Sequence, residues 1–96
     1  MKIVILPSAR DDLAEGLGFY EKQEDGLGGY FLESLLSDID SLRLYAGIHR
    51  KVFGFHRLLS SRFPYAIYYS MDPETLLVRA VLDCRRDPKW VRRKLE

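Results

Sequence analysis

The sequence predicts a single α+β domain over residues 1–96, in which an N-terminal strand and a helical hairpin pack on an antiparallel sheet. Two neighbouring stretches near the N-terminus space their apolar residues as helices do, and a glycine-rich break separates them. Several β-rich stretches joined by short turns follow, and such strands usually pair antiparallel. With 96 residues, 47% of them hydrophobic, the chain supports one compact core. The expected order is β-α-α-β-β-β-α.

The first strand and the first helix are separated by a proline. Residues Lys2–Leu6 are rich in β-branched side chains, and Pro7 ends the strand. Ser8 and Asp11 have the spacing of a capping box, so we expect the helix to start there. Its apolar face carries Ala9, Leu13, Leu17 and Tyr20. The acidic residues Asp11, Asp12 and Glu15 are expected on the solvated face, in the first turns, where the helix dipole favours negative charge.

The second helix has the clearest pattern in the chain. The preceding Gln23–Gly29 segment lacks the Lys-Ser/Thr pair of a phosphate loop, so it predicts a turn between antiparallel helices. Gly47 has the place of a residue that ends the second helix. The apolar stripe of this helix consists of Phe31, Leu32, Leu35, Leu36, Ile39 and Leu42.

The second half of the chain predicts strands and one last helix. Tyr65 and Tyr69 should share one sheet face with the core, while Tyr68 points to the other, partly covered face. Asp87 is expected to cap the last helix, with Pro88 in its first turn. The expected strands are Val52–Phe53, Phe55–Ser60, Tyr65–Met71 and Thr75–Asp83, the last two joined by a turn at Asp72–Glu74.

Several classes of site are excluded by composition. The one cysteine, Cys84, rules out an internal disulfide and is expected to be a small buried residue at a strand end. His49 and His56 have no further ligands near them, so we expect no metal site and no cofactor. The chain has neither a transmembrane segment nor a signal peptide, which predicts a cytoplasmic protein that does not contact a membrane.

Charge divides the chain into two halves. Residues 1–42 contain three basic and nine acidic residues, a formal charge of −6, whereas residues 43–96 contain twelve and five, a formal charge of +7. Such a polarised protein attracts an anionic partner with one face. We therefore expect the binding residues in the basic half, converging on one exposed surface: Arg50, Lys51, Arg57, Arg62, Arg85, Arg86, Trp90 and Arg93. Trp90 either caps the core or stacks on a base.

Taken in order, these segments resemble the RelE/ParE superfamily of toxins from bacterial type II toxin–antitoxin modules. The resemblance covers nearly the whole chain. The segments that carry it are Ala9–Leu13, Phe19–Glu21, Gly26–Gly28 with Phe31, Arg57, Arg62–Tyr69, and Val81–Pro88 with Trp90. It implies a protein that poisons its host cell and is neutralised by a cognate antitoxin, ParD-like or RelB-like.

The family contains two mechanistic classes, and the residues favour one of them. RelE-like toxins cut mRNA on the ribosome, and for that activity the candidate catalytic set here is Arg57, Arg62, Arg85 and His56. ParE-like toxins bind DNA gyrase without a known nuclease site. This chain lacks the lysine run of the RelE central strand, and Trp90 stands where a tyrosine would act, although indole only donates. The resemblance therefore favours a gyrase inhibitor of the ParE-like branch, with an mRNA endonuclease or a degenerate, non-toxic binding module as alternatives.

Overall fold

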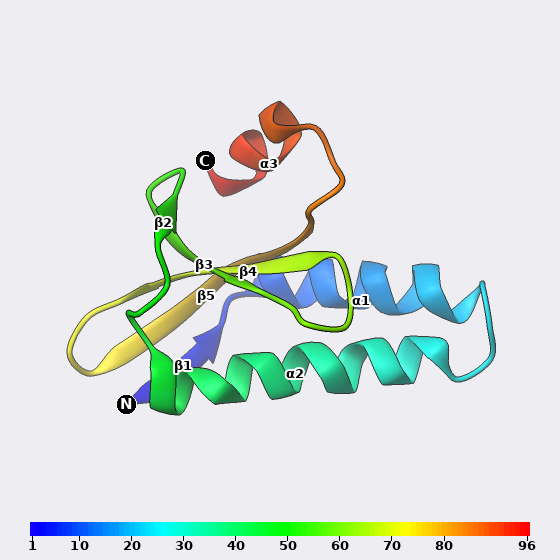
Figure 1. Ribbon diagram of the computed structural model, residues 1–96, viewed down its shortest axis with the longest axis horizontal. Helices are drawn as coiled ribbons and strands as arrows, with labels where there is room; N and C mark the ends of the chain where they lie inside the picture. The colour runs from blue at the N-terminus through cyan, green and yellow to red at the C-terminus, as the bar shows by residue number, and fades with distance from the viewer.

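The computed structural model describes residues 1–96 and has the element order that the sequence predicts (Figure 1). Two long antiparallel helices form one layer, a five-stranded sheet forms the next, and a short C-terminal helix lies on the far side of the sheet. No helix is both long enough and apolar enough to cross a membrane. The elements are β1 (Lys2–Ile5), α1 (Pro7–Glu21), α2 (Leu27–Tyr45), β2 (Lys51–Val52), β3 (Phe55–Leu59), β4 (Tyr65–Met71), β5 (Thr75–Asp83) and α3 (Pro88–Leu95).

The sheet is mixed rather than purely antiparallel. Its strand order is β1-β5-β4-β3-β2, and β1 pairs with β5 in parallel, with Lys2 opposite Thr75 and Ile5 opposite Val78. The helical hairpin carries the chain from one edge of the sheet to the other, so β1 and β2 lie at opposite edges. The hairpin-joined strands β2 to β5 are antiparallel, as expected.

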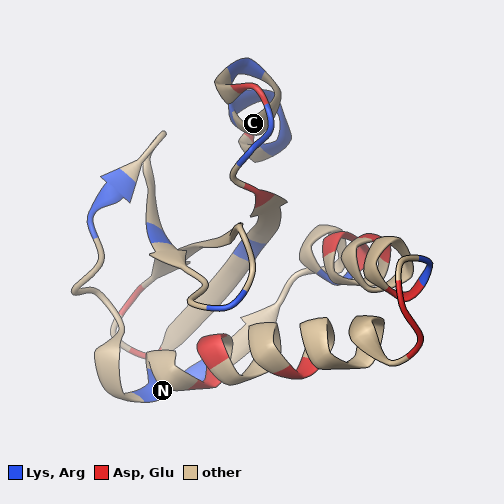
Figure 2. Cartoon of the chain, turned by 45° about the vertical axis from the view of Figure 1, so that its right-hand side comes forward, with Lys and Arg blue, Asp and Glu red and all other residues tan.

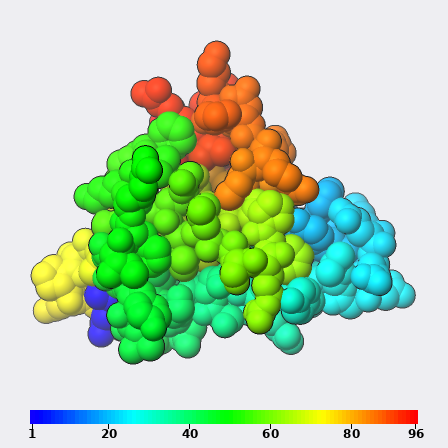
Figure 3. Space-filling model, in the orientation of Figure 1, coloured from blue at the N-terminus to red at the C-terminus, as the bar shows by residue number.

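Two apolar clusters cover the two faces of the sheet. The main core lies between the sheet and the helical hairpin and includes Phe31, Leu35, Tyr65 and Tyr69. The second cluster lies under α3 and consists of Ala66, Tyr68, Ala80, Leu82 and Val91. The predicted alternation along β4 is therefore confirmed: Tyr65 and Tyr69 face the helices, whereas Tyr68 faces α3. In the space-filling view, the orange and red C-terminal segment stands above the rest of the molecule (Figure 3).

The end of α2 and the start of α3 are where the sequence predicts them. Gly47 has φ 90° directly after the C-cap of α2, a conformation that glycine adopts without strain. Asp87 caps α3, because its Oδ1 accepts the N–H of Lys89 at 2.8 Å, and Pro88 is the first helical residue.

The predicted start of α1 is wrong. The helix begins at Pro7 with Leu6 as its N-cap and has no side-chain cap. The Ser8 hydroxyl instead donates to the carbonyl of Arg79 at 3.2 Å, which ties the helix to β5. A tertiary acceptor thus takes the hydroxyl that the local pattern assigns to capping.

The turn between the long helices is shorter than predicted, since the helical residues of α2 already include Gly28 and Gly29. The carboxylate of Glu21 accepts the N–H groups of Gly26 at 3.0 Å and Gly28 at 2.9 Å. This acid therefore satisfies two backbone donors at the start of α2, which local sequence pattern does not reveal.

Cys84 and Phe53 also differ from expectation. Cys84 follows β5 and is exposed, because the chain leaves the sheet there toward α3. Phe53 does not belong to a strand: with Gly54 it forms the tip of the β2–β3 hairpin at φ 54°. A bulky residue at positive φ is unusual, and this one is 43% exposed.

Candidate functional site

The charge division of the sequence becomes a division in space (Figure 2). Acidic residues are concentrated on α1, on α2 and on the turn between them, and basic residues on the β2–β3 side of the sheet and on α3. Among the basic residues of the second half, only Arg43, Arg85 and Lys94 lie within 4.0 Å of a carboxylate. Most of the guanidinium and ammonium groups are thus free to meet an anionic partner.

Two of the expected arginines meet at one cavity on the α3 side of the sheet. Arg57 comes from β3, where it lies opposite Tyr68, and Arg86 comes from the segment between β5 and α3. The cavity has a volume of about 160 Å³ and is lined by Val52, Phe53, Arg57, Tyr68, Cys84, Arg86, Pro88 and Val91. Two guanidinium groups without carboxylate partners, beside an apolar floor, are suited to hold an anionic group that carries an apolar neighbour.

Phe53 is the residue at this cavity that sequence reasoning missed. It lines the cavity from the hairpin tip, and it also lines a second hollow of about 300 Å³ with Arg92, Leu95 and Glu96. The signal that marks it is the Phe53-Gly54 pair between two strands, because a two-residue hairpin requires positive φ.

The other members of the expected nuclease set lie apart from Arg57. Arg62 belongs to the β3–β4 loop, and its guanidinium is 6.0 Å from the ring centre of Tyr30 on α2. His56 stacks on Tyr69 of the main core at 5.0 Å between ring centres, on the helix-facing side of β3. Because side chains alternate along a strand, His56 and Arg57 point to opposite faces of the sheet.

Arg85 is held by its own chain. Its Nε donates to Oδ1 of Asp83 at 3.0 Å and its Nη2 to Oδ2 at 2.8 Å, a two-point contact. These bonds lower the pKa of Asp83 and raise that of Arg85. Of the remaining expected residues, Arg50 and Lys51 lie exposed at the β2 edge of the sheet and Arg93 lies exposed on α3.

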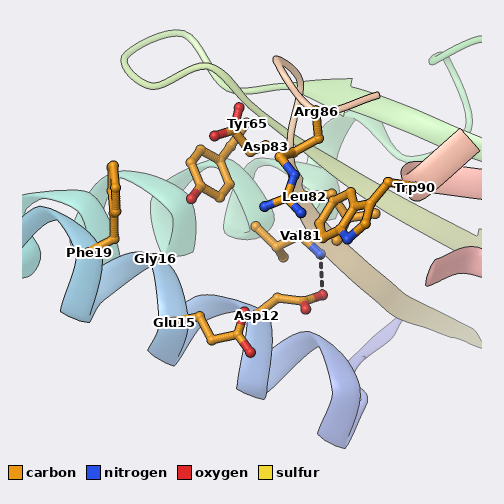
Figure 4. A pocket seen from close by; sticks show the side chains of 10 residues that line it. All are labelled: Asp12, Glu15, Gly16, Phe19, Tyr65, Val81, Leu82, Asp83, Arg86 and Trp90. Atoms are coloured by element: carbon orange, nitrogen blue, oxygen red, sulfur yellow. Dashed lines mark hydrogen bonds between the residues drawn. The ribbon is translucent and has the colours of Figure 1, made fainter. Parts of the chain in front are cut away.

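The expectation that Trp90 caps the core is met, and the same side chain borders a cavity. It is half-buried against the second cluster, and it also lines a cavity of about 200 Å³ between α1 and the end of β5 (Figure 4). The guanidinium of Arg86 lies 4.0 Å from the centre of its ring. The floor of this cavity includes Asp12, which is buried rather than solvated, because its Oδ2 accepts the N–H of Val81 at 3.0 Å. Burial raises the pKa of Asp12.

His49 forms a polar contact between the loop after α2 and the sheet. The hydroxyl of the fully buried Tyr69 accepts the N–H of Gly47 at 3.0 Å, and His49 Nδ1 lies 2.6 Å from the same oxygen. His56 Nδ1 lies 2.6 Å from the carbonyl oxygen of His49, so it donates to that oxygen. The phenol has one proton to give, and a neutral His49 accepts it.

This arrangement predicts a pH dependence of stability. Burial, with the nearby His56, holds the pKa of His49 below its ordinary value of 6.5, so the unfolded chain takes up that proton more readily. The contribution of His49 to the free energy of unfolding is therefore present above pH 6.5 and is lost as the pH falls through the lower, folded-state pKa. Urea unfolding between about pH 7.5 and pH 5 measures it, and H49Q should flatten the profile. A variant profile as steep as the wild type would contradict this assignment.

Comparison with known proteins supports the fold and leaves the family open. No protein-family model matches the chain, and no curated protein matches its sequence. Among solved structures, a chain of the chromosomal ParDE TA system from P. aeruginosa has a similar fold, with a TM-score of 0.73 and 17% sequence identity. The similarity covers 84% of this chain and 92% of that one. The chain has a ParE/RelE-like fold. The expected fold is therefore confirmed.

Proposed function

We propose that this chain is the toxin of a type II toxin–antitoxin module and is neutralised by a cognate antitoxin. The observation that carries the proposal is the fold similarity to a chain of a ParDE TA system over most of both chains. The unpaired basic surface around Arg57 and Arg86 supports it, because such a surface accepts an acidic partner.

We further propose that the target is DNA gyrase rather than mRNA on the ribosome. A ribonuclease of this kind needs cations and a proton acceptor at one place. His56 and Arg57 lie on opposite faces of β3, Arg62 lies beside α2, and Arg85 is bound to Asp83. The indole of Trp90 accepts no proton. These positions favour a binding protein over a nuclease, so the antitoxin would act by blocking a docking surface.

Induced expression tests this function. We expect the chain alone to stop colony formation and to trigger DNA-damage signalling, and the purified protein to inhibit supercoiling by gyrase. Co-expression of the antitoxin should restore growth, and a double variant R57A/R86A should lose toxicity if the free guanidinium groups contact the target. The exposed R10A on the opposite, helical layer is the matched control.

Other results would assign a different function. Message cleavage in a translation system with normal supercoiling would indicate the mRNA endonuclease, and loss of cleavage in H56A would then identify the base. Normal growth on expression of the chain alone would favour a degenerate binding module.

A further inference from the structure

The cavity between α1 and the end of β5 combines two kinds of lining (Figure 4). Carboxylates of Asp12 and Glu15 lie along one side, and both come from α1, three residues apart and therefore on one helix face. Aromatic rings of Phe19, Tyr65 and Trp90 stand around the opening. Its volume of about 200 Å³ is below the roughly 300 Å³ of pockets for drug-sized ligands, so it suits a single ring system.

The two carboxylates of α1 in the cavity have oxygens without a hydrogen-bond donor. The side chain of Asp12 is 6% exposed, and its Oδ2 accepts from Val81. Its Oδ1 has only Lys94 Nζ nearby, at 3.9 Å, which is beyond hydrogen-bond distance. Glu15 has no basic partner within 4.0 Å. The floor therefore offers acceptors to a ligand that brings N–H groups.

The opposite side of the cavity is built for a flat group. The guanidinium of Arg86 covers the indole of Trp90 at 4.0 Å and has no carboxylate within 4.0 Å. Planar bases stack on arginine and on aromatic side chains with comparable ease. A ring that enters beside Arg86 would meet Tyr65 on its other side.

Two kinds of ligand bring N–H donors, a basic side chain and a nucleotide base, and the charge at the rim of the cavity favours the nucleotide. Arg93 and Lys94 follow Trp90 by three and four residues, so they lie on the same face of α3, and Lys94 Nζ is 5.8 Å from the centre of the Trp90 ring. Asp83 also lines the cavity, but its carboxylate is paired with Arg85. Arg86 itself lines the cavity. This rim repels an incoming lysine or arginine and attracts a phosphate.

We propose that this cavity binds a guanine base, with the phosphate of its nucleotide at the face of α3 that carries Arg93 and Lys94. Guanine presents adjacent N–H donors, at N1 and N2, to a carboxylate, whereas adenine and cytosine present a single amino group on that edge. The base would stack beside Arg86 and donate to Asp12 and Glu15. The inference does not depend on the proposed toxin function, and its guanine can come from a free nucleotide or from a single strand.

Trp90 is the only tryptophan in the chain and lines this cavity, so tryptophan fluorescence reports a ligand that binds there. We expect GMP to quench it and to shift the amide resonance of Val81, while AMP and CMP do neither. E15Q should weaken GMP binding about tenfold through loss of a charge-assisted acceptor. The matched control is D11N, on the same helix, exposed and outside the cavity lining.

Equal binding of AMP and GMP, or an E15Q variant that binds GMP as tightly as D11N does, would overturn the proposal. A guanine-containing trinucleotide distinguishes the two sources. Tighter binding of the trinucleotide than of GMP indicates a single-strand site, and equal binding indicates a free nucleotide; both results support a guanine site. These binding measurements and the toxicity assays are independent, so failure of the guanine site and failure of the proposed toxin function can be told apart.

Discussion

L35A is expected to lower the free energy of unfolding by about 2–5 kcal/mol. Leu35 is fully buried in the main core between α2 and the sheet, so its truncation removes apolar contacts and leaves a cavity that the rigid surroundings fill only in part. Urea unfolding followed by far-UV circular dichroism measures the change.

The control for this prediction lies on the same helix. Leu44 is 81% exposed, so L44A makes the same chemical change without creating a cavity and should shift stability by less than about 0.5 kcal/mol. If both variants lost the same stability, the face of α2 that packs on the sheet would differ from the one described.

The next prediction concerns two adjacent glycines of α2 with opposite expected effects. A Cβ atom at Gly28 would lie 2.6 Å from the carbonyl oxygen of Leu17 and 2.9 Å from Cβ of Glu21, because α1 and α2 approach closely there. G28A must therefore push the two backbones apart and disturb the Glu21 contact, at a cost of about 1–3 kcal/mol or more.

G29A is the matched control. A Cβ at Gly29 meets nothing within 4 Å, so alanine there should stabilise the helix by roughly 0.5–1 kcal/mol. Thermal unfolding of the two variants side by side gives the comparison. If G28A were more stable than the wild type, α1 and α2 would lie farther apart at Gly28 than described.

Much of the fold follows from local pattern. The Asp87-Pro88 start of α3 and the turn at Asp72–Glu74 depend on neighbouring residues alone, and both are confirmed. The apolar stripe of α2 is confirmed except at Leu36, which is 40% exposed, whereas Ser34 is buried. The alternation of the tyrosines along β4 is confirmed for the same reason, since period-2 side-chain direction is a property of a strand by itself.

The candidate site was less accessible to sequence reasoning. Spacing identifies Arg57 and Arg86 as basic residues, but only the return of the chain after β5 brings them to one cavity. The same reasoning grouped His56 with Arg57, although adjacent residues of a strand face opposite ways. The expectation that Asp12 lies on a solvated helix face is wrong. Its carboxylate accepts the N–H of Val81, a contact between residues far apart in the sequence that local pattern does not reveal.

By itself, then, the sequence determined the elements, their order and the division of charge between the two halves of the chain, because these arise from short-range periodicity and composition. Tertiary structure alone decided the parallel pairing of β1 with β5, the burial of Asp12 and the partners of each arginine. The physical reason is that these features depend on contacts between distant segments, whose geometry is set by the packing of the whole sheet between its helices.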